Sequence, residues 1–200
     1  MKLRTGLLLA VIVLILAVAG YGAAVLVLND GLPFRKMRTV SESMAPTLRS
    51  GTTITARKRA PAELRRGDIA VFSVGDSFWI MRVAGLPGDR IGMRDGVVIL
   101  NGKPIAQTDA GKLSIEGREA RVRTERLPGE AQSHRVLDLE PTQGDNVPDV
   151  TVPARRLFVL GDNRDNAADS RFPAGPVGGS GLVSFENVYG IVPPEEIDGG

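Results

Sequence analysis

The chain has 200 residues, of which 42% are hydrophobic, and a formal net charge of +2, a size that predicts one or two domains. This near balance of charge does not favour a nucleic-acid-binding protein, because such binding depends on basic clusters that contact phosphates. The chain has no cysteine, which excludes disulfides, a thiol nucleophile and a zinc-thiolate site, and a single histidine cannot build a histidine-rich metal centre. We therefore expect no metal and no cofactor.

Residues 6–28 contain 20 apolar residues, three glycines and no charge. A helix of this length spans about 34 Å, enough to cross a hydrocarbon core of about 30 Å. The run therefore predicts a transmembrane helix, with residues 1–5 in the cytoplasm and residues 29–38 as a linker.

A cleavable secretory signal is the alternative, because the basic start of the chain is followed by a small-x-small site at Ala17-Val18-Ala19. The apolar run continues well past that site to Leu28, which favours an uncleaved anchor. Both alternatives place the remainder of the chain, residues 39–200, outside the cytoplasm if the N-terminus stays in.

After Arg38 the apolar residues come in short runs separated by turn-forming residues, which is typical of strands. Asp95-Gly96 and Asn101-Gly102 are preferred pairs for type I′ hairpin turns, so residues 90–105 are predicted to form a β-meander. The polar region 107–150 is interpreted as a variable insertion or second subdomain. The clearest strands are residues 69–74, 79–84, 97–100 and 157–160.

Residues 40–48, Val-Ser-Glu-Ser-Met-Ala-Pro-Thr-Leu, place two serines just after the linker. An isolated serine in a turn is usually structural. Here the segment is followed by three others, Arg-Gly-Asp-Ile-Ala-Val-Phe at 66–72, residues 79–90, and Gly-Asp-Asn-Arg-Asp-Asn-Ala-Ala-Asp-Ser-Arg at 161–171. Four such segments in this order behind an anchor resemble the bacterial type I signal peptidases, also called leader peptidases.

The resemblance covers about residues 39–192, apart from the region 107–150. It implies a mainly β protein: one transmembrane helix followed by an antiparallel β domain with an inserted β subdomain. It also implies a serine endopeptidase of the cytoplasmic (inner) membrane, with its C-terminal domain extracytoplasmic. Its partners would be the lipid bilayer and the signal peptides of exported preproteins, cut after small residues (Ala-x-Ala).

The same resemblance implies roles for individual residues. Ser43 falls at the nucleophile, and Ser41 falls at the position whose hydroxyl assists the Ser43 backbone N–H in an oxyanion hole. Donors fixed in this way stabilise the charge that develops on the carbonyl oxygen. Asp169 and Arg171 match a charged pair that braces the site from behind.

The general base is where this sequence departs from the family. The family has a lysine just before the Arg-Val pair, and this chain has Met81 there. A methionine fills the same apolar slot, but its thioether cannot act as a base near neutral pH. The family usually also has a serine that hydrogen-bonds the lysine, and this chain has Ala167 at that position.

No other side chain is predicted to supply the base. His134 lies in a polar stretch of the variable region and is expected at the surface. A solvated lysine has a pKa near 10.4 and is protonated at neutral pH. Proteolysis is therefore expected to be lost or strongly reduced. The lysines predicted to be solvated are Lys36, Lys58, Lys103 and Lys112.

The resemblance also predicts a groove that takes the substrate in extended form along strand edges, lined in part by Ile80, Arg82, Val83 and Ala84. Two alternatives share this groove. One is a non-catalytic homologue that binds exported or pilus-type proteins as an assembly factor, and the other is a processing peptidase of a conjugation system. Cleavage of an Ala-x-Ala preprotein separates the enzyme from the binding protein.

Overall fold

The computed structural model describes residues 11–22, 24, 32–175 and 178–197. Residues 11–22 are helical, and the rest of the predicted span 6–28 lies mostly outside the described residues. Within the described part of the chain, no helix combines the length and the apolarity needed to cross a bilayer. The chain divides into two compact units, residues 1–35 and residues 36–200.

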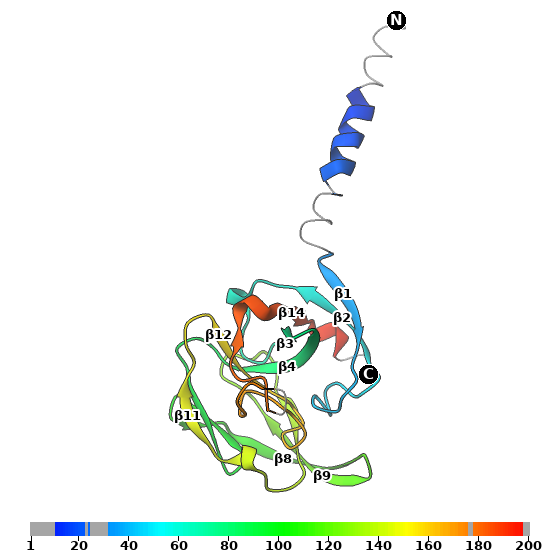
Figure 1. The fold of residues 1–200 in the computed structure, drawn as a ribbon. Helices are drawn as coiled ribbons and strands as arrows, with labels where there is room; N and C mark the ends of the chain where they lie inside the picture. The colour runs from blue at the N-terminus through cyan, green and yellow to red at the C-terminus, as the bar shows by residue number, and fades with distance from the viewer. Residues whose placement is uncertain (1–10, 23, 25–31, 176–177, 198–200) are drawn as a thin grey trace, which may run out of the picture. The chain divides into compact units, whose positions relative to one another are not determined.

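The largest sheet has seven strands in the order β1-β2-β14-β3-β4-β12-β13 (Figure 1), and the pairs from β2 to β13 are antiparallel. Its central strands β3 and β4 are largely buried because they pack against the main apolar core, which also contains Met44 and Leu48. The strands are β1 (Phe34–Arg38), β2 (Thr53–Lys58), β14 (Val188–Val192), β3 (Ile69–Val74), β4 (Ser77–Gly85), β12 (Arg156–Leu160) and β13 (Val183–Ser184).

A second sheet has the order β11-β5-β6-β7, with β11 (Val147–Thr151), β5 (Arg90–Arg94), β6 (Val97–Leu100) and β7 (Lys103–Pro104). The two turns of β5-β6-β7 have positive φ at both central residues, 47° and 75° at Asp95-Gly96 and 52° and 77° at Asn101-Gly102. Those conformations are the ones that type I′ turns require. The predicted meander over residues 90–105 is confirmed.

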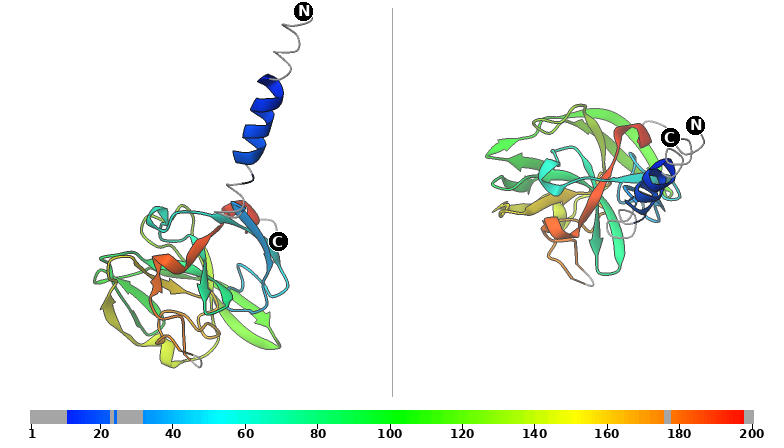
Figure 2. Two further views of the ribbon diagram at one scale, coloured as in Figure 1. Left: turned by 45° about the horizontal axis from the view of Figure 1, so that its top comes forward. Right: turned by 90° about the horizontal axis from the view of Figure 1, so that it is seen from above.

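The third sheet joins β10 (His134–Asp138), β9 (Arg118–Glu125) and β8 (Gln107–Ile115) in that order. Figures 1 and 2 show β8 and β9 as a long hairpin. The region 107–150 is not built as one piece, because its last strand, β11, pairs with β5 of the second sheet. The remaining elements are 3₁₀ turns: η1 (Pro61–Glu63), η2 (Gln143–Asp145), η3 (Phe185–Asn187) and η4 (Pro194–Glu196).

The predicted mainly antiparallel β architecture is confirmed.

One contact between the sheets positions the candidate site. Leu137 of β10 forms a parallel bridge with Asn163, which follows β12. The Leu137 N–H donates to the Asp162 carbonyl at 2.8 Å, and the Arg164 N–H donates to the Leu137 carbonyl at 3.0 Å. The third sheet therefore supports the segment 162–164 through its backbone.

Candidate active site

The two serines lie in a turn between β1 and β2. The hydroxyl oxygens of Ser41 and Ser43 are 3.0 Å apart and form a hydrogen bond. Ser41 is exposed and Ser43 is half-buried, whereas the next two residues, Met44 and Ala45, are buried. The Leu48 N–H closes the turn by donating to the Met44 carbonyl at 2.8 Å. Burial of Met44 and Ala45 thus anchors the turn while the hydroxyl of Ser43 remains accessible.

The segment after β12 holds this turn from the interior. The Asn163 N–H donates to the Ser43 carbonyl at 3.0 Å, and the Asn163 side-chain amide donates to the Glu42 carbonyl at 3.1 Å. The Thr47 hydroxyl donates to Asp162 at 2.5 Å. Asn163 and Asp162 are each 1% exposed. Because both backbone carbonyls around Ser43 are fixed, the direction of its side chain is restricted.

Met81 lies on β4 opposite Ala70 of β3, and its side chain is buried in the same core as Met44. Among the described residues, the hydrogen-bond partner of Ser43 Oγ is the Ser41 hydroxyl, and no amine or imidazole bonds to it. A methionine at this position provides packing without a proton acceptor of useful strength. The four lysines predicted to be solvated are all exposed.

Ala167 lies on another side of the turn. A Cβ added to Gly161 would lie 2.2 Å from the Ala167 Cβ and 2.7 Å from the Ser43 carbonyl oxygen. The Ala167 methyl group and the Ser43 backbone therefore approach the same point, separated by the bare Cα of Gly161. The Ala167 side chain has no polar atom and therefore offers no hydrogen bond to the site.

Asp169 and Arg171 form the predicted charge pair. Arg171 Nε donates to Asp169 Oδ1 at 2.9 Å and Nη2 donates to Oδ2 at 2.9 Å, and both side chains are fully buried. Asp169 Oδ2 also accepts the Gly161 N–H at 3.0 Å, and Arg171 Nη2 donates to the Arg164 carbonyl. A bidentate pair of this kind has a fixed geometry, so it stiffens the segment from residue 161 to residue 171.

Arg82, the neighbour of Met81, is buried and binds Asp162 through two hydrogen bonds of 2.8 and 2.5 Å. It also donates to the Gly67 carbonyl at 2.8 Å. Burial raises the pKa of Asp162, but Arg82, His134 and the Thr47 hydroxyl together outweigh burial, so the pKa stays below the ordinary value. This ionic contact joins β4 to the segment that holds Ser43.

Three of the four predicted groove residues are inaccessible. Arg82, Val83 and Ala84 are at most 5% exposed, and this end of β4 is paired with β12 on one side. Ile80 is half-buried. The β3 strand pairs with β4 from Ser77 to Arg82, whereas β12 pairs with it from Arg82 to Gly85. An extended peptide could therefore reach the first half of β4 but not the second.

A comparison with known families bears on this site. A family model described as signal peptidase, peptidase S26, matches residues 6–193. The chain belongs to this family. The match includes all four segments that carried the resemblance and also the region 107–150.

Several signal peptidases I are similar to this chain. One from Bacillus licheniformis is 33% identical over 74% of this chain and 68% of its own length. Another, from Rickettsia canadensis, is 36% identical over 62% of this chain and 49% of its own length. The chain thus spans about half the length of that relative. A signal peptidase I crystal structure from Enterococcus faecalis shows 24% identity, covers 66% of this chain and 97% of its own, and has a TM-score of 0.39.

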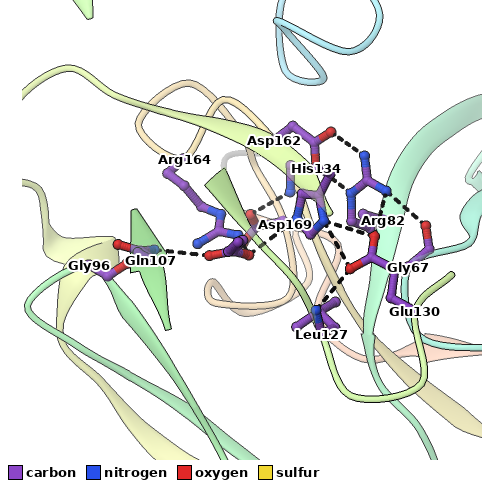
Figure 3. Close-up of polar contacts among 12 residues, drawn as sticks. Gly67, Arg82, Gly96, Gln107, Leu127, Glu130, His134, Asp162, Arg164 and Asp169 are labelled. Atoms are coloured by element: carbon purple, nitrogen blue, oxygen red, sulfur yellow. Dashed lines mark hydrogen bonds and ion pairs between the residues drawn. The ribbon is translucent and has the colours of Figure 1, made fainter. Parts of the chain in front are cut away.

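His134 was predicted at the surface, and that prediction is wrong. In this signal peptidase homologue the residue is 8% exposed on β10, with its Nδ1 atom 2.8 Å from Glu130 Oε1 (Figure 3). Alternation of apolar and polar residues in His-Arg-Val places His134 on the same side as buried Val136. That alternation is the sequence signal that could have predicted its burial.

Asn163 and Asp162 have no predicted role, although both lie in the segment 161–171. Their contacts with Ser43, Thr47 and Arg82 join residues far apart in the sequence, so spacing alone could not predict them. The described residues contain no group of three or more His, Asp and Glu side chains that could hold a metal ion.

Proposed function

We propose that this chain is a membrane-anchored serine endopeptidase that acts on the signal peptides of exported preproteins and whose catalytic rate is lost or strongly reduced. The observation that supports this most is the Ser41–Ser43 hydroxyl pair in a turn whose carbonyls are fixed by Asn163, in a member of the signal peptidase family. The relatives named above are all signal peptidases, which does not favour the alternative of a non-catalytic assembly factor.

In this proposal the Ser43 Oγ attacks the carbonyl carbon of the scissile peptide bond. The negative charge that develops on the carbonyl oxygen is stabilised by the Ser43 backbone N–H and the Ser41 hydroxyl. Loss of one such donor typically lowers the rate by about 10² to 10³. The hydrogen bonds from Asn163 support this step because they fix the backbone from which both donors project.

Attack by Ser43 requires a group that accepts its proton, and Met81 cannot do so. A lysine buried there would lose solvation and have a lowered pKa, which would make it a base near neutral pH. Ala167 adds to this conclusion, because a serine there without a lysine partner would carry an unsatisfied hydroxyl. Residual cleavage through oxyanion stabilisation and substrate binding is compatible with this account.

The proposal includes the predicted arrangement along the chain. Residues 6–28 span the cytoplasmic membrane, residues 1–5 stay in the cytoplasm, and residues 29–38 form a linker. Residues 39–200 fold outside the cytoplasm, with 107–150 as a variable inserted subdomain. The composition of residues 6–28, apolar and uncharged over a length of about 34 Å, supports this arrangement.

The substrate-binding edge in this proposal is the first half of β4. β12 pairs with β4 only from Arg82 to Gly85, and an extended peptide binds a strand edge through main-chain hydrogen bonds. Side chains two apart on a strand point to the same face, so Phe78, which is 40% exposed, shares a face with Ile80. Pockets for small residues at this edge would give the Ala-x-Ala preference.

Photo-crosslinking tests this function without requiring catalysis. The full chain in detergent carries p-benzoylphenylalanine in place of Phe78, and a matched control carries it in place of Thr108, which is exposed on β8. We expect crosslinks from position 78 to an Ala-x-Ala preprotein and fewer to the same preprotein with arginine before the cleavage point. Equal crosslinking from position 108, or no discrimination between the two preproteins, would contradict the proposal.

A further inference from the structure

The single histidine lies in a buried ionic cluster that none of the steps above uses. His134 Nδ1 is 2.8 Å from Glu130 Oε1 and 3.1 Å from Oε2. Its other ring nitrogen, Nε2, is 3.2 Å from Glu125 Oε1 without the geometry of a hydrogen bond. A neutral imidazole has one N–H, whereas both nitrogens here face carboxylates. The surroundings therefore favour the protonated ring.

The two carboxylates around His134 connect, through arginine side chains, to Asp162 and Arg164, the residues on either side of Asn163. Glu130 Oε1 lies 3.4 Å from Nη1 of Arg82, which binds Asp162 (Figure 3). Glu125 Oε1 accepts from Nη2 of Arg164. Asp162 and Arg164 are the sequence neighbours of Asn163, whose N–H donates to the Ser43 carbonyl. His134 thus lies between two chains of contacts that converge on the serine turn.

The charges of this cluster balance only if His134 is protonated. Two guanidinium groups, Arg82 and Arg164, face three carboxylates, Glu125, Glu130 and Asp162, and all five residues are at most 8% exposed. The cluster then carries a net charge of −1 with a neutral histidine and zero with a protonated one. The adjacent pair Asp169 and Arg171 is neutral by itself. An uncompensated buried charge is costly, so protonation of His134 stabilises the cluster.

We propose that protonated His134 is a positioning residue for Ser43: it neutralises Glu125 and Glu130, which hold the segment 162–164 against the serine turn. Loss of the proton leaves the cluster with one uncompensated negative charge, so the contacts of Glu125 and Glu130 with Arg164 and Arg82 rearrange and the hydrogen bond from Asn163 to Ser43 weakens. The catalytic role of Ser43 rests on the proposed function, whereas the mechanical link to its backbone does not.

The pKa of His134 agrees in direction with this geometry. Burial lowers its pKa, but Glu125 and Glu130 together outweigh burial, and the pKa lies above the ordinary value. The remaining charged groups that act on the ring are Arg82, which opposes protonation, and Asp162, which favours it. The link is therefore strongest below the pKa of His134 and weakens as the pH rises through that pKa.

Amide hydrogen exchange of the full chain in detergent tests this inference without any cleavage. The amide of Asn163 reports on the link, and the amide of Val152, which donates to the Asp89 carbonyl at 2.8 Å, is the reference. Rates are expressed as protection relative to the intrinsic exchange at each pH. We expect protection of Asn163 to fall by about tenfold or more as His134 deprotonates, while the protection of Val152 stays unchanged.

Two variants separate the charge from the shape of the side chain. His134→Gln leaves the cluster with a net charge of −1 and should lower the protection of Asn163 at every pH. His134→Gln combined with Glu130→Gln restores neutrality, so it should recover most of the protection and show no dependence on pH. If the ring had a purely structural role, the Asn163 amide would be less protected in the double variant than in the single one. That result would overturn the inference.

The wild-type pH series decides the question even if His134→Gln does not fold, because flat protection of Asn163 across the titration of His134 would also overturn the inference. A cleavage assay uses the double variant Met81→Lys with Ala167→Ser. In this variant, deprotonation of His134 should lower kcat more than it changes KM. If that background does not cleave at all, the proposed function fails, and the exchange result for His134 still stands on its own.

Discussion

The Ser43 turn has two unlike sides. Toward the segment 161–171 it meets buried charged groups, with Asp162 bonded twice to Arg82 and Asn163 bonded to two backbone carbonyls. Toward Met81 it meets an apolar core, to which Met44 of the turn and Met81 both belong. In the proposed mechanism, Asn163 and Asp162 position Ser43, whereas Met81, at the position of the expected base, cannot take its proton. Positioning and proton transfer are thus separable properties of this fold.

On the apolar side, the residues at positions 81 and 167 suit each other. A lysine at position 81 would need a polar partner, and a serine at position 167 would need one too, because a buried donor or acceptor without a partner is costly. Methionine and alanine together remove both requirements. This is why the two differences from the family pattern are better understood as one change than as two.

Among the changes to the ionic side, removal of Asp162 should lower the free energy of unfolding most. Asp162→Ala leaves the buried Arg82 guanidinium without its bidentate partner, and we expect a loss of about 3–5 kcal/mol in the free energy of unfolding. Urea denaturation of the full chain in detergent measures it. Asp76→Ala is the matched control, since Asp76 is exposed and should change stability by less than about 0.5 kcal/mol. Similar losses in both variants would contradict the importance of the ionic side.

Gly161 lies between the two sides, and a substitution there tests how tightly the turn is packed. Gly161→Ala places a methyl group 2.2 Å from the Ala167 Cβ and 2.7 Å from the Ser43 carbonyl oxygen, and overpacking of this kind costs about 1–3 kcal/mol. Thermal or urea unfolding should show that loss. The control Gly175→Ala adds a methyl group with nothing within 4 Å and should be nearly neutral. A neutral Gly161→Ala would mean that the turn is not held tightly here.

A change of pH should weaken the ionic side and leave the apolar side unchanged. The pKa of His134 is raised in the folded protein, so its contribution to stability is complete below its unfolded pKa of about 6.5 and is lost as the pH rises through the folded value. Unfolding free energies should therefore decline as the pH rises from about 6.5 through the folded pKa of His134. His134→Gln should remove that decline, and an unchanged slope in this variant would assign it to another group.

Local patterns predicted much of the fold. The Asp-Gly and Asn-Gly turns and the strand runs follow from residue conformations and alternation that can be read within a few positions. For the site, only residues within the four segments that resemble the family could be predicted. Burial of His134 could have been predicted from the alternation within β10, but the Asn163 contacts with the serine turn and the loss of access to Val83 and Ala84 depend on which strands pair across the chain. Such long-range pairings are not encoded in local spacing.

Cleavage of an Ala-x-Ala preprotein by Met81→Lys combined with Ala167→Ser is the most direct test of the central claim that Ser43 lacks only its base. The account predicts little or no cleavage by the wild-type chain and a clear gain in the double variant. That gain should disappear when Ser43→Ala is added. Efficient cleavage by the wild-type chain that depends on Ser43 would contradict the claim, because another group would then have to accept the proton.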